Sequence, residues 1–273
     1  AWRVSKLPVF ENSSAVDDLK LRFSYGVTGR SGFDRYTAQA KYSGFGQYYS
    51  DTYGKFIMGY GPGNNPNYDL AWEKQISYNL GIDYTLFNSR LSGSFDAFIR
   101  EGRDVIGEYP VPLPPYLHDK IYANVGTTTS KGFEFQVNWD AVQTKDFSWS
   151  TTLTWSMDRN RIDELSNGRT EDVNNKWFVG EEIGVYYDWV YDGIWKTEEA
   201  EEAAKYGRKP GQIKVKDLNN DDTIDANDDK KIVGHTRPRW TGGWSNTFSY
   251  KNFELSFFIL SRWGFTVPQG AVT

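Results

Sequence analysis

The chain has 273 residues, with 36 acidic and 31 basic side chains, a formal net charge of −5 and no cysteine. Disulfides and thiolate metal sites are therefore excluded, and an acidic chain lacks the basic face that nucleic-acid binding requires, so no nucleic-acid partner is expected. No run of about 18 apolar residues occurs, which excludes a membrane-spanning helix, although aromatic residues make up 17% of the chain.

Apolar and polar residues alternate with a period of two in a series of segments. In the first segment Leu19, Leu21 and Phe23 alternate with Lys20 and Arg22. Successive side chains of a strand point to opposite faces, so each such segment is predicted to be a strand with one apolar face and one polar face. The chain is expected to hold about seven spanning strands, at 19–28, 75–87, 91–103, 131–141, 147–158, 241–250 and 253–263.

The connections between these segments alternate in length. Short turns at 88–90, 142–145 and 251–252 join three pairs of strands, and long polar stretches at 29–74, 104–130 and 159–240 lie between the pairs. Short turns at one end and long loops at the other are typical of an outer-membrane barrel, whose long loops are extracellular. The predicted fold is therefore all-β, a transmembrane antiparallel β-barrel. A soluble β-sandwich with an aromatic core is the alternative.

Seven strands are too few to close a membrane barrel, because an unpaired strand edge in lipid leaves backbone groups unsatisfied. The chain is therefore interpreted as a contiguous arc of a larger barrel, with the rest of the protein outside residues 1–273. The residues expected to face lipid are Phe133, Phe135, Val137, Leu153 and Trp155, and those expected to face the lumen are Glu134, Gln136 and Ser150.

An acidic segment within the loop region 159–240 has the ligand spacing of a calcium loop. In DLNNDDTIDANDDKKIVG, acids or amides stand at positions one, three, five, nine and twelve. The candidate ligands in 217–228 are Asp217, Asn219, Asp221, the carbonyl of Thr223, Asp225 and Asp228, since Ca²⁺ prefers six or more oxygen ligands. Asp222 replaces the glycine expected at position six, and extended segments replace the flanking helices, so a solvated acidic turn is the alternative.

Other candidate sites are weaker. The segment 197–207 is predicted to be a short surface helix capped by Thr197. His118 and His235 are the two histidines of the chain, and no nucleophile is paired with either, so both are interpreted as ordinary loop residues.

Two further groups have plainer explanations than a site. Glu181 and Glu182 are adjacent and would point apart, so no catalytic pair is expected and the chain is not predicted to be an enzyme. The loop aromatics Tyr186, Tyr187, Trp189, Tyr191 and Trp195 could stack on sugar rings, but packing within the protein is favoured.

Several long segments match one family in order over nearly the whole chain. They are LKLRFSYGVTG, NPNYDLAWEKQISYNLGIDYTLFNSRLSGSFDAF, PVPLPPYLHDKIYANVGTTTSKGFEFQVNW, DFSWSTTLTWSMDRNRI, VYDGIWKTEEAEEA and PGQIKVKDLNNDDTIDANDDKKIVGHTRPRWTGGWSNTFSYKNFELSFF. They resemble the C-terminal part of the barrel of SusC/RagA-type TonB-dependent outer-membrane transporters. The plug domain, the N-terminal extension and the aromatic-ended last strand of that family are not among the matching segments.

The resemblance implies a barrel of about 22 strands in the outer membrane of Bacteroidota. It also implies active import of large nutrients, oligosaccharides or peptides, energised by TonB through a plug. A SusD-like surface lipoprotein is the implied partner, expected to meet the loops 104–130 and 159–240. A soluble carbohydrate-binding β-domain is the alternative function, and a β-rich glycosidase would need facing carboxylates that the sequence does not display.

Overall fold

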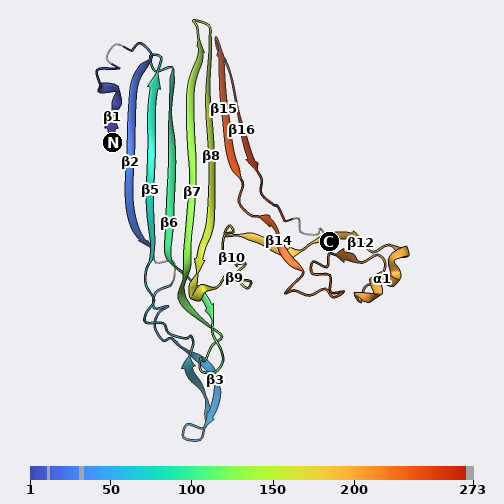
Figure 1. Cartoon of the computed structure of the whole chain (residues 1–273). Coiled ribbons are helices and arrows are strands. Elements are labelled where there is room, and N and C mark those ends of the chain that lie inside the picture. The colour runs from blue at the N-terminus through green and yellow to red at the C-terminus, as the bar shows by residue number, and fades with distance from the viewer. Residues whose placement is uncertain (11–12, 31–33, 269–273) are drawn as a thin grey trace.

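A computed structural model of the chain describes residues 1–10, 13–30 and 34–268 (Figure 1). Its main element is an antiparallel sheet of eight strands, in the order β1-β2-β5-β6-β7-β8-β15-β16. The bounds of these strands are β1 Trp2–Arg3, β2 Val16–Arg30, β5 Glu73–Leu86, β6 Leu91–Pro110, β7 Lys120–Gln143, β8 Phe147–Leu165, β15 Trp240–Tyr250 and β16 Phe253–Trp263. The seven long strands lie side by side along the length of the molecule.

The predicted all-β fold and its seven spanning strands are confirmed, because each predicted range overlaps one long strand of the sheet. The two-residue β1 was not predicted, since so short a strand shows no alternation. Within the described residues the sheet is open, with β1 and β16 at its edges. An open sheet agrees with the interpretation of the chain as part of a larger barrel. No helix among the described residues is long and apolar enough to cross a membrane.

The stretch 104–130 differs from its prediction as a long loop, because most of it continues β6 and β7. The two strands stay paired as far as Pro110 and Lys120. Their register shifts between Gly102 and Val105, and Asp104 there takes a φ of 57°. A bulge of this kind inserts an extra residue and breaks the period of two on which the sequence prediction depends.

The extended strands carry a small core of their own. β8 runs as far as Leu165, so the long loop predicted from residue 159 begins later than expected. Val125, Ile162 and Leu165 are buried where β7 and β8 extend beyond the predicted strand ends. Burying such side chains stabilises the extension by about 1.5–3 kcal/mol each.

The register confirms the predicted separation of the two faces. Directly opposite residues point to the same side, and Phe135 lies opposite both Phe95 and Trp155, while Val137 lies opposite Leu153. Rings meet across the strands, with Phe135 and Trp155 centroids 5.6 Å apart. On the polar face Glu134 lies opposite Asp96 and Ser156, Gln136 lies opposite Thr154, and Ser150 lies opposite Thr247.

The apolar face is open to its surroundings, which distinguishes this sheet from a soluble sandwich. Phe23 is 68% exposed, Leu80 is 55% exposed and Leu153 is 42% exposed. An exposed apolar surface that extends over several strands marks contact with lipid or with another apolar surface.

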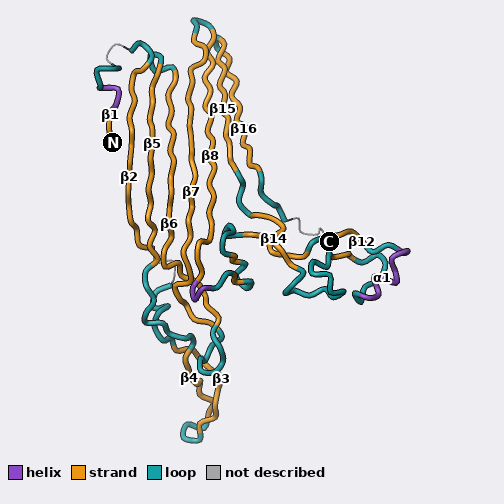
Figure 2. Tube along the Cα trace, viewed as in Figure 1, coloured by secondary structure: helices purple, strands orange, loops and turns teal. Residues whose placement is uncertain are grey.

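The short and long connections lie at opposite ends of the sheet, as predicted (Figure 2). At one short turn Phe87, Asn88 and Ser89 all have positive φ values. We call the opposite end, where the polar stretches gather, the long-loop end. Turns of two to four residues at one end and long loops at the other are the arrangement of outer-membrane barrels.

Smaller elements fill the long-loop end. The pairs are β3 (Tyr42–Ser50) with β4 (Lys55–Pro62), β9 (Glu171–Asp172) with β10 (Trp177–Phe178), β11 (Val185–Trp189) with β14 (Lys230–His235), and β12 (Tyr191–Ile194) with β13 (Ile213–Val215). Short 3₁₀ turns stand at Ser166–Gly168 and Thr197–Glu199, and one helix, α1, spans Ala200–Lys205; a further 3₁₀ turn, Val4–Lys6, lies at the short-turn end. Residues 185–235, here called the arm, project to one side of the sheet in Figure 1.

The predicted helix at 197–207 is present, but its predicted cap is wrong. The first turn is a 3₁₀ turn that already includes Thr197, and Lys196 is the residue that precedes it. The carboxylate of Glu199 accepts a hydrogen bond from the backbone N–H of Lys196 at 2.9 Å. That hydrogen bond, together with one from Lys214, lowers the pKa of Glu199. Glu199 therefore caps the turn, a role that the sequence analysis gave to Thr197.

Candidate functional site: the polar face and the loops around it

A polar recess of about 560 Å³ lies on the polar face at the long-loop end. The residues that line it are Arg30, Glu73, Gln75, Arg100, Gly102, Val105, Ile106, Thr128, Thr129, Ser130, Asn160, Trp177, Ile183 and Arg237. Three of them are arginines and one is a carboxylate, so the recess carries a net positive charge. No residue of this set was singled out from the sequence as a site.

The arginines of the recess are positioned by neighbours on the same face. The Arg100 guanidinium lies 4.2 Å from the centroid of the Phe98 ring. That ring is buried over Gly132, where a Cβ would lie 2.9 Å from its Cζ atom. Arg237 forms an ion pair with Asp158 at 3.0 Å. Planar guanidinium groups held in this way suit carboxylates and polar oxygens of a ligand.

The segment after β10 forms one side of the recess. The side-chain oxygen of Asn160, itself buried, accepts a hydrogen bond from the backbone N–H of Ile183 at 2.6 Å. Ile162 exchanges backbone hydrogen bonds with this segment, donating to Glu181 at 2.9 Å and accepting from Gly180 at 2.8 Å. These contacts fix Trp177 and Ile183 against the strands. The sequence could not reveal them, because they join residues about 20 positions apart without a motif.

A second ionic cluster lies on the polar face nearer the short turns. Arg22 donates from Nε to Asp83 at 2.9 Å and from Nη2 to Asp96 at 2.8 Å. Gly81 stands between them, and a Cβ there would lie 2.6 Å from an Asp96 oxygen. The cluster thus ties three neighbouring strands together on the side predicted to line the lumen.

The β3–β4 hairpin exposes an aromatic surface at the long-loop end. Its most exposed large side chains are Tyr42, Phe45, Tyr53, Phe56 and Tyr60, each at least 66% exposed. Aromatic side chains on an exposed surface suit contact with another protein or with sugar rings. The sequence analysis placed this hairpin within a polar loop, and the aromatic spacing in KYSGFGQYYS is the signal that could have found it.

Asparagine side chains fasten the chain after this hairpin to the β6–β7 hairpin. Asn65 donates to the carbonyls of His118 at 2.7 Å and Lys120 at 2.9 Å. Asn124 donates to the carbonyls of Ala71 at 3.0 Å and Asp104 at 2.7 Å. Because both amides bind backbone on a separate segment, the segment 62–71 and the β6–β7 hairpin form one unit.

The two histidines have different surroundings. The Nε2 atom of His118 lies 3.0 Å from the carbonyl oxygen of Pro62. His235 lies 3.4 Å from Glu182, which also forms an ion pair with Arg239 at 3.4 Å. Glu182 and Arg159 are 4.0 Å apart. His235 therefore belongs to a charged cluster at the base of the arm.

The loop aromatics pack within the arm to different degrees. Trp195 is 4% exposed, with its ring 5.8 Å from that of Tyr206 and under the Lys214 ammonium. Tyr187 lies 4.8 Å from Phe178. Tyr191 is 66% exposed. The favoured interpretation, packing within the protein, is therefore confirmed for Trp195 and Tyr187.

The acidic segment 217–228 forms an ordered series of turns between β13 and β14. Asp217 accepts backbone N–H groups of Asn220 at 2.6 Å and Asp222 at 2.9 Å. Asp221 accepts from Thr223 at 2.8 Å. Asp222, which stands where the pattern has glycine, takes a left-handed conformation, with φ 62°. Carboxylates that bind the backbone two or three residues ahead form Asx turns.

The remaining predicted ligands also form hydrogen bonds within the segment, and these contacts do not test the calcium prediction. Asp225 accepts the backbone N–H groups of Asn227 at 2.7 Å and Asp228 at 3.1 Å, and Asn219 donates to Asp221 at 3.0 Å. Among the described residues no three acidic, histidine or cysteine side chains are grouped so as to hold a metal ion. Calcium binding at 217–228 stays a prediction.

Asp229 is a residue that the sequence analysis missed. It is 1% exposed, and its carboxylate accepts the N–H of Leu218 at 2.7 Å and that of Asp225 at 2.9 Å. It therefore closes the acidic segment from inside. The signal was available, since Asp229 directly follows the twelve residues of the ligand pattern.

Replacing Asp229 by alanine is expected to destabilise the acidic segment by about 1–3 kcal/mol, because two backbone donors lose their buried acceptor. Hydrogen exchange of the amides in 217–229 measures the effect. The matched control is Asn227→Ala, since the Asn227 side chain is exposed and is not among the candidate ligands. Equal exchange rates in the two variants would contradict the role assigned to Asp229.

Comparisons with known proteins identify the family. The model of the TonB dependent receptor-like β-barrel family matches residues 12–271. TonB-dependent receptor P3 of Formosa agariphila is 29% identical over 280 residues, which cover 97% of this chain and 27% of that protein. TonB-dependent receptor SusC of Bacteroides thetaiotaomicron is 24% identical over 94% of this chain and 26% of its own length.

A solved structure shows the same architecture. The RagAB peptide transporter matches with a TM-score of 0.75 and 26% identity, over 95% of this chain and 28% of the matched chain. This chain thus spans about a quarter of the length of the relatives it matches. With its seven long antiparallel strands, exposed apolar face and match over residues 12–271, the chain belongs to the TonB dependent receptor-like β-barrel family.

Proposed function

We propose that the chain is part of a transporter that imports a large polar nutrient, an oligosaccharide or a peptide, across the bacterial outer membrane, energised by TonB. The observation that carries the proposal is the cationic recess on the polar face at the long-loop end. Hydrogen-bonding and charged side chains there meet a solute that enters from outside, whereas the opposite face is apolar. The RagAB structures are described as a peptide transporter and a peptide importer, which supports a peptide.

The exposed apolar face favours this function over a soluble carbohydrate-binding domain. Side chains such as Phe23 and Leu80 would face water in a soluble protein, at a cost of about 1.5–3 kcal/mol each relative to burial. In a membrane they face lipid. The function proposed requires no bond of the substrate to break.

A surface lipoprotein of the SusD type is the proposed partner. The aromatic β3–β4 hairpin, the β6–β7 hairpin and the arm all lie at the long-loop end, which is extracellular in an outer-membrane barrel. Aromatic side chains that are enriched at protein interfaces are exposed on the first of these. The matched structure carries the paired name RagAB, which supports a second component.

Uptake by cells that express the full-length protein tests the function. Labelled oligosaccharides and peptides are offered to cells with and without TonB, and accumulation is expected with one of the two classes and only with TonB. Arg100→Gln and Arg237→Gln are expected to reduce uptake at equal surface abundance, and Lys145→Gln, at a short turn, is the control. Uptake that persists without TonB would contradict the proposal, as would isolation of the protein without detergent.

Calcium is proposed as a structural ion of the acidic segment 217–228. The Asx turns already hold Asp217, Asp221 and Asp225 in a compact series, and a hard cation would offset the repulsion among these carboxylates. Because extracellular calcium is plentiful, weak binding, with a dissociation constant of about 10⁻⁴–10⁻³ M, would suffice.

Removing calcium with a chelator is expected to accelerate proteolysis within 211–234 and to leave the sheet intact. The physical reason is that several carboxylates in one short segment repel one another when no cation is bound. Limited proteolysis followed by mass spectrometry locates the cuts. Asp217→Ala is expected to be cut rapidly with or without calcium. Equal cutting rates of the native protein in the presence and absence of calcium would contradict the site.

A further inference from the structure

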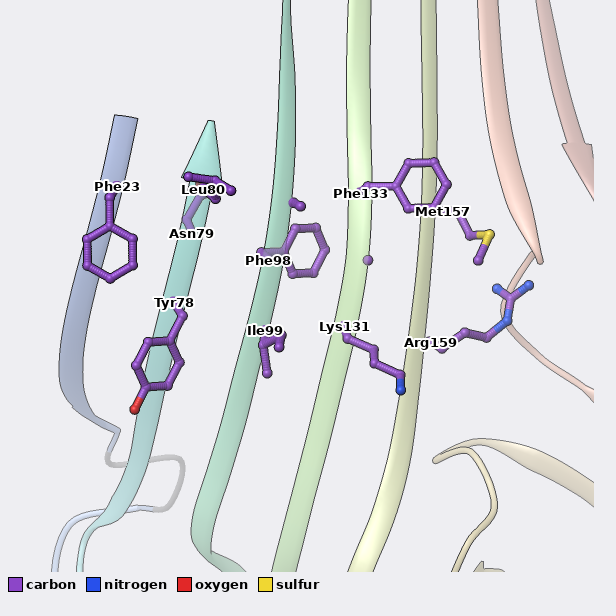
Figure 3. A pocket seen from close by; sticks show the side chains of 12 residues that line it. Phe23, Tyr78, Asn79, Leu80, Phe98, Ile99, Lys131, Phe133, Met157 and Arg159 are labelled. Carbon is purple, nitrogen blue, oxygen red and sulfur yellow. The ribbon is translucent and has the colours of Figure 1, made fainter. Parts of the chain in front are cut away.

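An apolar groove of about 490 Å³ runs over the centre of the exposed apolar face (Figure 3). The residues that line it are Phe23, Tyr78, Asn79, Leu80, Ala97, Phe98, Ile99, Lys131, Gly132, Phe133, Met157 and Arg159. They come from β2, β5, β6, β7 and β8, and the last four of these are interior strands of the sheet. Most of the lining residues therefore lie on interior strands of the sheet.

Two cations mark one end of the groove. Lys131 lies directly opposite Arg159 across β7 and β8, and the next pair on the same face toward the short turn is Phe133 opposite Met157. The cations thus stand at the long-loop end of the groove, as Figure 3 shows. Like charges directly opposite each other on a sheet repel, and the Glu182 carboxylate, 4.0 Å from Arg159, offsets this repulsion on the Arg159 side.

Arg159 is partly engaged by the protein, and Lys131 is not. Arg159 donates from Nη1 to the carbonyls of Asp158 at 2.8 Å and Arg239 at 2.7 Å. The Lys131 ammonium makes no hydrogen bond or ion pair with residues 1–10, 13–30 or 34–268, and its side chain is exposed. It is a donor without an acceptor at the rim of an apolar groove.

A second recess, of about 310 Å³, continues from these cations toward the base of the arm. Its lining residues are Thr129, Lys131, Arg159, Asn160, Arg161, Gly180, Glu181, Glu182, His235 and Arg239. Glu182 is engaged by Arg239 at 3.4 Å, and Arg161 by Asp163 at 2.7 Å. With Lys131 and Arg159 added, the permanent cations in the recess outnumber the two lining carboxylates.

The apolar groove and this second recess, at Lys131 and Arg159, together fit one kind of ligand. We propose that they bind a phosphorylated, acylated lipid of the outer leaflet, with an acyl chain along Phe133 and Met157 and a phosphate at Lys131 and Arg159. The placement rests on the proposed outer-membrane location, in which the long-loop end is extracellular. A lysine that only snorkels to the interface needs no groove behind it. Here the groove leads directly to the cations.

Native mass spectrometry of the full-length protein in detergent tests the site. The probes are diphosphoryl lipid A, the same lipid without its phosphates, and inorganic phosphate. We expect an adduct with the phosphorylated lipid, and we expect Lys131→Gln to lower its occupancy about tenfold, since a charge-assisted hydrogen bond to phosphate is lost. Lys145→Gln, the same change at a short turn, is expected to leave occupancy unchanged.

A second variant tests the groove without touching a charge. Ala97→Phe fills the groove between Leu80 and Phe133 and is expected to weaken the same adduct, while it adds apolar surface to a lipid-facing position. Equal occupancy with the dephosphorylated lipid, or equal loss in Lys145→Gln, would overturn the proposal. Competition by inorganic phosphate at the same concentration as the lipid would assign the cations to a soluble anion and would also overturn it. Failure of nutrient uptake would leave this result unaffected, because the adduct is measured without transport.

Discussion

Replacing Val137 by arginine is expected to destabilise the folded barrel by about 2–4 kcal/mol, the cost of a cation on the lipid face near the bilayer midplane. Val137 lies opposite Gly93 and Leu153 on the apolar face. It stands six residues before the end of β7 at Gln143, and at about 3.4 Å per residue this is about 20 Å along the strand. A tilt of about 40° leaves about 15 Å of depth, half of a bilayer core of about 30 Å.

The matched control is Gln136→Arg, one residue away on the polar face. Gln136 lies opposite Ser94 and Thr154, so an arginine there faces the lumen and water. Denaturant unfolding of the full-length protein in lipid vesicles gives both free energies. A larger loss for Gln136→Arg than for Val137→Arg would reverse the assignment of the two faces.

Replacing Trp195 by alanine is expected to unfold the arm while the sheet stays folded. Trp195 is buried beside Tyr206, and the Lys214 ammonium lies 4.3 Å from its ring centroid. Removing a buried tryptophan leaves a cavity and costs about 3–5 kcal/mol. Because α1 has six residues and β13 has three, a loss of this size exceeds what so small a unit can withstand.

Hydrogen exchange in residues 191–217 measures this loss, and exchange in β7 and β8 reports on the sheet. Tyr191→Ala, on the same strand as Ile194, is the control because Tyr191 is 66% exposed. Protection that survives in Trp195→Ala would show that other contacts hold the arm. Loss of protection throughout β7 and β8 would show that the arm and the sheet fold as one unit.

The long strands could be predicted from the sequence because each one separates two environments. Leu19, Leu21 and Phe23 alternate with Lys20 and Arg22 only because lipid lies on one side and water on the other. Where this alternation was interrupted, the sequence no longer predicted a strand. The register shift between Gly102 and Val105 hid the extension of β6. A shift between Gly44 and Gln47, with Gly46 at a φ of 68°, similarly hid the β3–β4 hairpin.

The candidate site was harder to predict than the fold. The recess joins Arg30, Arg100 and Arg237, which lie far apart in sequence and share no motif. The pairing of β11 with β14 spans about 40 residues of chain, so no local pattern records it. The acidic segment was found because its ligand spacing is local, yet Asp229, which holds it closed, stands just outside that pattern.

The asparagine contacts at the long-loop end have a mechanical consequence. β6 and β7 continue from the sheet, past the register shift between Gly102 and Val105, into their outer hairpin, and Asn65 and Asn124 bind that hairpin to the segment 62–71. A force on this hairpin is therefore transmitted directly to the sheet through β6 and β7. The arm meets the sheet at its base, where Glu182 pairs with His235 and Arg239, each at 3.4 Å, so a force on the arm reaches the sheet through these ion pairs. The long-loop end is thus connected to the sheet in two ways, through the continuing strands β6 and β7 and through the ion pairs at the base of the arm.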